Sequence, residues 1–121
     1  VLIVAEGLFM YFAEGEVRSV FACLTGRFPG AQMLIEMLAP CALGLGKYDP
    51  CLSRIASGSL EFRWALGDCR AMESWGCGLK VLGESNVLEH HRERWGWLNF
   101  FPPQAMSVLG NRIVHLGFAR E

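Results

Sequence analysis

The sequence predicts an α/β fold in which parallel strands form a sheet that packs against helices. Residues 1–5 (VLIVA) form a continuous apolar run, typical of a strand with both faces covered. Residues 31–38 (AQMLIEML) indicate a second mainly apolar strand, and residues 14–27 between them have the spacing of one helical stripe. The apolar residues of that stripe are Val17, Val20, Phe21 and Leu24. Strand, helix and strand in this order predict a βαβ unit with parallel strands.

The boundaries of these elements agree with the residues around them. Glu14 and Glu16 lie in the predicted first helical turn and Arg27 lies near its end, as the helix dipole favours. The dipeptide 29–30 (PG) ends the helix, and Pro40 closes the second strand.

The remainder of the chain is less regular. Residues 41–59 have no sustained period, and we interpret them as a long loop or a broken helix that is a candidate lid or substrate-facing insertion. Residues 60–64 alternate apolar and charged side chains and predict a short strand or extended segment. Asp68 is the expected cap of a short helix through Trp75, which Gly76 and Gly78 end. Two further strands are predicted at residues 79–82 and 111–119.

Composition narrows the classes of protein. The chain has 121 residues, enough for one domain, and 52% of them are hydrophobic. Eleven Lys and Arg against twelve Asp and Glu give a formal net charge of −1, which argues against nucleic acid as a partner. The apolar run at residues 1–13 is interrupted by Glu6 and is too short to span a membrane. It also has no basic residue ahead of it, so we expect neither a membrane partner nor a signal peptide.

The cysteines favour a reducing, cytoplasmic location. There are five of them, at wide spacings and without a C-x-x-C pair, so they cannot form a complete set of intramolecular disulfides. A zinc site would have to recruit Cys77 with His90 and His91, which lack the paired spacing of structural zinc ligands. We therefore expect no metal site.

Glu6 is the residue that draws attention on physical grounds alone. It follows the first predicted strand directly, and open α/β sheets bind ligands beyond the carboxyl ends of their parallel strands. A carboxylate buried there needs a partner, which a cationic or multiply donating ligand could supply. The alternative is that nearby backbone N–H groups satisfy it. The residues by themselves leave both interpretations open.

The first part of the chain also carries a family resemblance. Residues 5–12 (AEGLFMYF), the acidic helix at 14–27 and residues 28–31 (FPGA) resemble a continuous stretch of the leucine carboxyl methyltransferase-like family. This family of class I S-adenosylmethionine-dependent O-methyltransferases includes the tetracenomycin-type polyketide enzymes. The similarity continues, in chain order, at residues 62–66, 73–82 and 112–114.

The resemblance implies a more specific fold. The chain is similar to the C-terminal half of a Rossmann-like class I methyltransferase, with parallel strands, an antiparallel last strand and helices on both faces of the sheet. Residues 1–121 would then be part of a single domain whose donor-binding N-terminal half, with its glycine-rich turn, is absent from this sequence. An apolar strand at the start of the chain fits the expectation that this is the C-terminal part of a longer protein.

The resemblance also implies roles for individual residues. S-adenosylmethionine is the expected cofactor, and the acceptor is expected to be a carboxyl or hydroxyl group of a polyketide-like small molecule. The donor-site residues are expected to be Glu6, which contacts the donor, Gly7, which allows close backbone approach, and Met10, which walls the site. Tyr11 matches the motif tyrosine near the donor and the substrate, and is the expected catalytic residue. The substrate side is expected to include Tyr48, within 41–59, and Trp64.

Two function classes remain in view. The first is an O-methyltransferase that is active only together with its N-terminal half. The second is a non-catalytic, methyltransferase-like interaction module whose exposed sheet edge pairs with another chain. Besides a small-molecule acceptor, the expected partners are therefore the missing half or a second copy of the chain.

Overall fold

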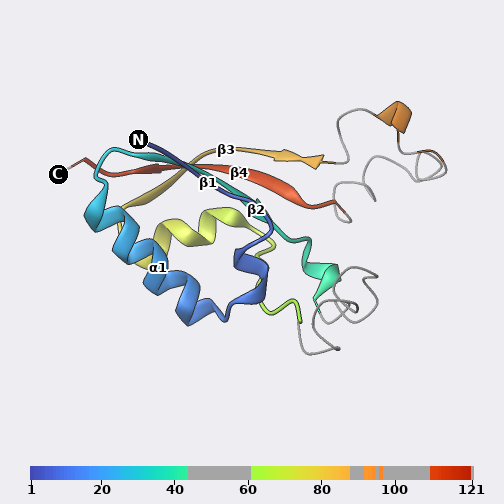
Figure 1. The fold of residues 1–121 in the computed structure, drawn as a ribbon, viewed down its shortest axis with the longest axis horizontal. Coiled ribbons are helices and arrows are strands. Elements are labelled where there is room, and N and C mark those ends of the chain that lie inside the picture. The colour runs from blue at the N-terminus through green and yellow to red at the C-terminus, as the bar shows by residue number, and fades with distance from the viewer. Residues whose placement is uncertain (44–60, 88–91, 95, 97–109, 121) are drawn as a thin grey trace.

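The structure is a computed structural model that describes residues 1–43, 61–87, 92–94, 96 and 110–120. Within these residues a mixed sheet of four strands has the order β1-β2-β4-β3 (Figure 1). The strands are β1 (Leu2–Ala5), β2 (Gln32–Met37), β3 (Leu79–Asn86) and β4 (Arg112–Phe118). The predicted α/β class is confirmed.

The strand directions also follow the prediction. β1 and β2 are parallel, with Leu2 beside Gln32 and Ala5 beside Ile35. β4 is antiparallel to both of its neighbours, β2 and β3. The last strand is therefore the antiparallel one, and β3 runs in the same direction as β1 and β2.

Helix α1 (Glu14–Arg27) connects β1 to β2 and has the predicted bounds. The carboxylate of Glu16 accepts a hydrogen bond from the backbone N–H of Ala13 at 2.8 Å, which satisfies one of the donors at the start of the helix. Val17 and Phe21 are fully buried, but Val20 is 37% exposed. The apolar stripe that packs on the sheet is thus narrower than the sequence predicts.

The helices cover one face of the sheet. Figure 1 shows η1 (Phe9–Tyr11), α1 and η4 (Cys69–Trp75) on the same side of the strands. Their side chains and the inward residues of the strands form the core, which includes Phe9, Phe21, Met33, Ile35, Met72, Val114 and Leu116. The expectation of helices on both faces is wrong for the described residues, because Leu2 and Val4 of β1 are 61% and 64% exposed.

The short helices are 3-10 helices. Asp68 caps η4 as predicted, accepting a hydrogen bond from the N–H of Arg70 at 2.9 Å, and Gly76 ends it in the left-handed conformation. Two others are η2 (Pro40–Ala42) and η6 (Arg92–Arg94). None of the helices in the described residues is long and apolar enough to cross a membrane.

Strand β3 extends four residues beyond the predicted 79–82, and it contains a bulge. The pairing with β4 shifts between Val81 and Gly83, so that Val81 lies beside Leu116 and Gly83 beside His115. A bulge inserts one residue and reverses the alternation of side chains after it. Glu84 therefore lies beside the buried Val114, on the same face as Val81. Residues 61–66 belong to no helix or strand, so the structure shows no strand in the described part of 60–64.

Candidate functional site

The candidate site lies where β1, β2 and β3 end, because these three strands run in one direction. The chain leaves β1 at Glu6 and Gly7, leaves β2 after Met37, and enters β4 at Arg112, which pairs with both Met37 and Asn86. In open α/β sheets this is the edge at which ligands bind.

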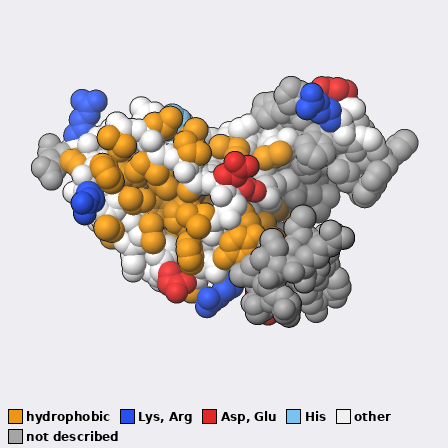
Figure 2. Space-filling model, viewed as in Figure 1, with side chains coloured by type: hydrophobic (Ala, Val, Ile, Leu, Met, Phe, Trp, Pro, Cys, Tyr) orange, Lys and Arg blue, Asp and Glu red, His pale blue; other side chains and the backbone are white. Residues whose placement is uncertain are grey.

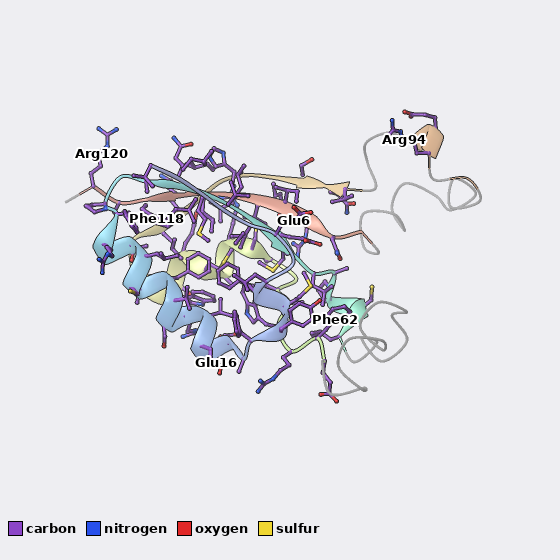
Figure 3. The ribbon with its side chains drawn as sticks, viewed as in Figure 1. Glu6, Glu16, Phe62, Arg94, Phe118 and Arg120 are labelled. Atoms are coloured by element: carbon purple, nitrogen blue, oxygen red, sulfur yellow. The ribbon has the colours of Figure 1, made fainter. Side chains whose placement is uncertain are left out.

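Glu6 is exposed at this edge, where Figure 3 labels it at the end of β1. The carboxylate is therefore not buried, and burial does not require it to have a partner. Among the described residues, no hydrogen bond or ion pair engages its side chain. Neither backbone N–H groups nor a cation in that part of the chain satisfies it, so the carboxylate is free to accept hydrogen bonds from a ligand.

A second carboxylate, Glu36, occupies the position beside it. Its Oε2 accepts a hydrogen bond from the backbone N–H of Gly7 at 2.9 Å, and its Oε1 accepts one from Nδ2 of Asn111 at 3.1 Å. The side-chain oxygen Oδ1 of Asn111 in turn accepts a hydrogen bond from the backbone N–H of Ala39 at 3.1 Å. We call these four residues, Gly7, Glu36, Ala39 and Asn111, the Glu36 clasp. The backbone-satisfied carboxylate that the sequence suggests for Glu6 belongs to Glu36.

Gly7 has a conformational reason to be glycine. Its φ is +61°, in the left-handed region, yet a Cβ built there would meet nothing within 4 Å among atoms outside its neighbours. The turn therefore requires glycine for its backbone angles and not for space among protein atoms. The N–H of Gly7 already donates to Glu36, which leaves the side chain of Glu6 as the polar group of this turn that faces outward.

Met10 and Tyr11 lie in η1, directly after this turn. The side chain of Met10 is buried, at 5% exposed, and its carbonyl accepts hydrogen bonds from the N–H groups of Arg63 at 2.7 Å and Trp64 at 3.3 Å. The half-buried ring of Tyr11 packs against Phe62, with ring centroids 5.7 Å apart. The structure thus places η1 beside residues 62–64, and of these the sequence analysis assigned Trp64 to the substrate side.

Trp64 is a core residue, although its backbone lies beside η1. The ring is 3% exposed and lies 6.5 Å from the ring of Phe9 and 6.1 Å from that of Trp75, centroid to centroid. Its indole Nε1 is buried, and no partner for it is found in the described part of the chain. Direct contact between this side chain and a substrate would need movement of its neighbours. Tyr48 lies outside the described residues.

A polar group on the helix-covered side of the sheet was missed by sequence reasoning. The thiol of Cys69 donates a hydrogen bond to Oε2 of Glu84 at 3.0 Å, and Arg112 lies 3.7 Å from the same carboxylate oxygen. Arg112 also donates to the carbonyls of Leu66 and Gly67. Burial, together with the hydrogen bond to Glu84 and its charge, raises the pKa of the Cys69 thiol to about 11. Cys69 is consequently a thiol and not a thiolate at neutral pH.

Two open hollows lie elsewhere on the molecule. One, of about 380 Å³, is lined by the start of β3 and the end of β4, including Lys80, Leu82 and Gly117. The other, of about 490 Å³, lies between the end of α1 and Arg120. Both are at the opposite end of the strands from Glu6, and neither has an acid among the described residues that line it. They do not belong to the candidate site.

The comparisons with known proteins add no family. No protein-family model matches the chain, and no curated protein matches it significantly. Within the described residues, no cluster of three or more His, Cys, Asp or Glu side chains is arranged to hold a metal ion. The chemistry of the site therefore has to be argued from Glu6, its turn and the residues of η1.

Proposed function

We propose that this chain forms the C-terminal half of an S-adenosylmethionine-dependent O-methyltransferase domain and contributes Glu6 and Tyr11 to its active site. The observation that carries the proposal is the exposed Glu6 carboxylate, free among the described residues, at the end of β1. It occupies the acid position of the AEG motif through which residues 5–12 resemble the leucine carboxyl methyltransferase-like family. The antiparallel last strand, β4, also agrees with that fold.

The chemistry of Glu6 fits the proposed donor. S-adenosylmethionine carries hydroxyl and amino groups, and an ionised carboxylate with free oxygens accepts hydrogen bonds from several such donors. Because the Gly7 N–H is occupied by Glu36, the side chain of Glu6 is the part of this turn that binds. Met10, three residues after Gly7 in η1, has a buried side chain.

The remaining residues position the acceptor. When bound, S-adenosylmethionine supplies an electrophilic methyl group for in-line displacement by an acceptor oxygen. The protein's task is to align the two groups and to exclude water. We assign Tyr11 to the acceptor side, since η1 places it after Glu6 and against Phe62. A carboxylate acceptor is already ionised at neutral pH, whereas a hydroxyl acceptor must lose a proton. Tyr48 and Trp64 remain proposed for the substrate side, Trp64 through its contact with η1.

Calorimetric binding tests this proposal. S-adenosylmethionine and S-adenosylhomocysteine are titrated into the 121-residue chain and into a version extended by the residues encoded upstream, each with and without Glu6→Gln. We expect the extended protein to bind both ligands and Glu6→Gln to weaken binding by at least about tenfold, or about 1.4 kcal/mol. A folded extended protein that binds neither ligand would overturn the proposal.

The second function class is an interaction module, and the bare face of the sheet favours it. Leu2, Val4, Leu82 and Ile113 are exposed on that face, and β1 is an edge strand among the described residues. An unpaired edge with apolar side chains is a template for pairing with another chain. Sedimentation of the 121-residue chain, with Val4→Lys as the control, separates the two functions. Self-association that Val4→Lys abolishes, in a chain that binds no donor when extended, supports the module.

A further inference from the structure

We propose that Glu36 is a positioning residue, which fixes the turn that presents Glu6 to a ligand. The inference rests on the proposed function, in which Glu6 binds the methyl donor. It concerns a residue that the sequence did not single out and whose side chain does not need to touch the ligand.

The sheet register places the two acids side by side. β1 and β2 are parallel, and their last registered pair is Ala5 with Ile35. Glu6 and Glu36 are the next residues of the two chains, and two adjacent carboxylates repel each other unless other groups engage their charge. Glu36 is half-buried and has a donor on each oxygen, the Gly7 N–H and the Asn111 amide. Both oxygens of Glu36 are therefore engaged by donors of this chain, whereas those of Glu6 are engaged by none among the described residues.

The clasp acts on the one residue that makes this turn flexible. Glycine is free to adopt many backbone angles, and Gly7 adopts a φ of +61° that other residues rarely take. Hydrogen bonds to a charged acceptor are stronger than those between neutral groups. The 2.9 Å bond from the Gly7 N–H to Glu36 thus selects one conformation of a residue that would otherwise sample several, and so fixes the position of Glu6.

Asn111 anchors the clasp to the rest of this edge. Its side chain is hydrogen-bonded both to Glu36 and to the backbone N–H of Ala39, which follows β2. The backbone carbonyl of Asn111 accepts a hydrogen bond at 2.9 Å from the N–H of Val87, which follows β3. The chain segments that leave β1, β2 and β3 are therefore tied to the residue that precedes β4. Glu36 has a fixed framework against which to hold the turn.

The experiment combines hydrogen exchange with a double-mutant cycle. Exchange of the Gly7 amide is measured by NMR in the 121-residue chain for wild type, Glu36→Ala and Glu36→Gln. Affinity for S-adenosylhomocysteine is measured in the extended protein for wild type, Glu36→Ala, Glu6→Gln and the double variant. Glu73→Ala is the matched control, because Glu73 also accepts a backbone N–H, that of Val81 at 2.8 Å, away from the Glu6 turn.

We expect Glu36→Ala to accelerate Gly7 exchange and to weaken binding, each by at least about tenfold, while Glu73→Ala changes both by less than about twofold. Glu36→Gln should be intermediate, because its single amide oxygen can serve one of the two donors. In the Glu6→Gln background, Glu36→Ala should add less than about twofold, since it acts through Glu6.

Three results would overturn the inference, and each differs from the others. Unchanged Gly7 exchange in both Glu36 variants would show that the clasp does not hold the turn. Faster exchange with unchanged affinity, while Glu6→Gln still weakens binding, would overturn the positioning role and leave the proposed function standing. Absence of binding by the folded wild-type extended protein would overturn the proposed function and, with it, the role of Glu36 in ligand binding.

Discussion

The two faces of the sheet are built from the same four strands but have opposite surroundings. On one face Met33, Ile35, Val114 and Leu116 are at most 1% exposed beneath α1, η1 and η4. On the other, Leu2, Val4 and Leu82 are between 50% and 64% exposed. Both sets are apolar, so the hydrophobicity of a strand residue in this protein does not reveal whether it is covered.

The bare face continues around the β1 edge. Figure 2 shows hydrophobic side chains gathered over the part of the molecule where β1 and α1 lie. Exposed apolar residues in these elements include Leu2, Val4 and Val20, and Val1 directly precedes β1. Contiguous apolar surface of this kind marks an interaction face more often than scattered single residues do. Comparing substitutions on the two faces therefore tests whether the second face is covered in solution.

The largest difference in the cost of a substitution to the free energy of unfolding is expected between two leucines on adjacent strands. Leu116→Ala removes a fully buried side chain and should lower the free energy of unfolding by about 2–5 kcal/mol. Leu82→Ala, at a side chain that is 50% exposed and packs beside Gly117, should cost less than about 1 kcal/mol. Urea unfolding of both variants measures the contrast. Equal losses would mean that the bare face is buried against another surface in solution.

The free energy of unfolding should also depend on the N-terminal cap of η4, which packs on the helix-covered face. Asp68→Ala removes the acceptor for the Arg70 N–H and should cost about 1 kcal/mol, within a range of about 0.5–2. Asp68→Asn keeps a side-chain oxygen and should stay within about 0.5 kcal/mol of wild type. Thermal unfolding checks both variants, and an Asn variant as unstable as the Ala variant would contradict the capping role.

The buried thiol on the covered face makes stability depend on pH. The pKa of Cys69 is raised from 9.0 to about 11, so the folded chain keeps a proton that the unfolded chain loses. Its contribution is present below about pH 9 and is lost as the pH rises towards 11, by about 1 kcal/mol at pH 10. Subtracting the urea-unfolding profile of Cys69→Ala from that of wild type isolates this effect. A difference that does not change between about pH 8 and 10 would refute it.

The smallest effect is expected for a polar substitution on the bare face. Val4→Thr should change the free energy of unfolding by less than about 0.5 kcal/mol, because the side chain is 64% exposed. Val114→Thr places a hydroxyl in the core and should cost at least about 1 kcal/mol. If Val4→Thr costs as much, and the loss depends on protein concentration, then this face is an interface between copies of the chain.

Local patterns in the sequence were enough to predict the βαβ unit and the Asp68 cap. The helical spacing around Val17 and Phe21, and the short distance from Asp68 to Arg70, involve residues close together in the chain. The exposure of β1 could not be predicted this way. A continuous apolar run such as residues 1–5 is compatible with a strand covered on both faces and with one covered on a single face.

The candidate site was predictable in part. Glu6 and Gly7 follow a strand directly, so their place at the carboxyl edge could be anticipated. Glu36 could not, because it lies inside an apolar run and its two donors are 29 and 75 positions away. The one available signal was a single acid near the end of a strand predicted to be parallel to the strand that precedes Glu6.

The bulge in β3 gives the covered face its polar chemistry. Without the bulge, a regular ladder that continued from the pair Val81 and Leu116 would place Leu82 beside His115 and Glu84 beside Ile113. Glu84 and Asn86 would then face the bare side of the sheet, and Cys69 and Arg112 would lose the carboxylate between them. The extra residue therefore decides which face of the sheet the end of this strand presents its acid to. A deletion of Leu82 would leave a regular ladder with the same pairs after it, so Glu84 would still face Cys69.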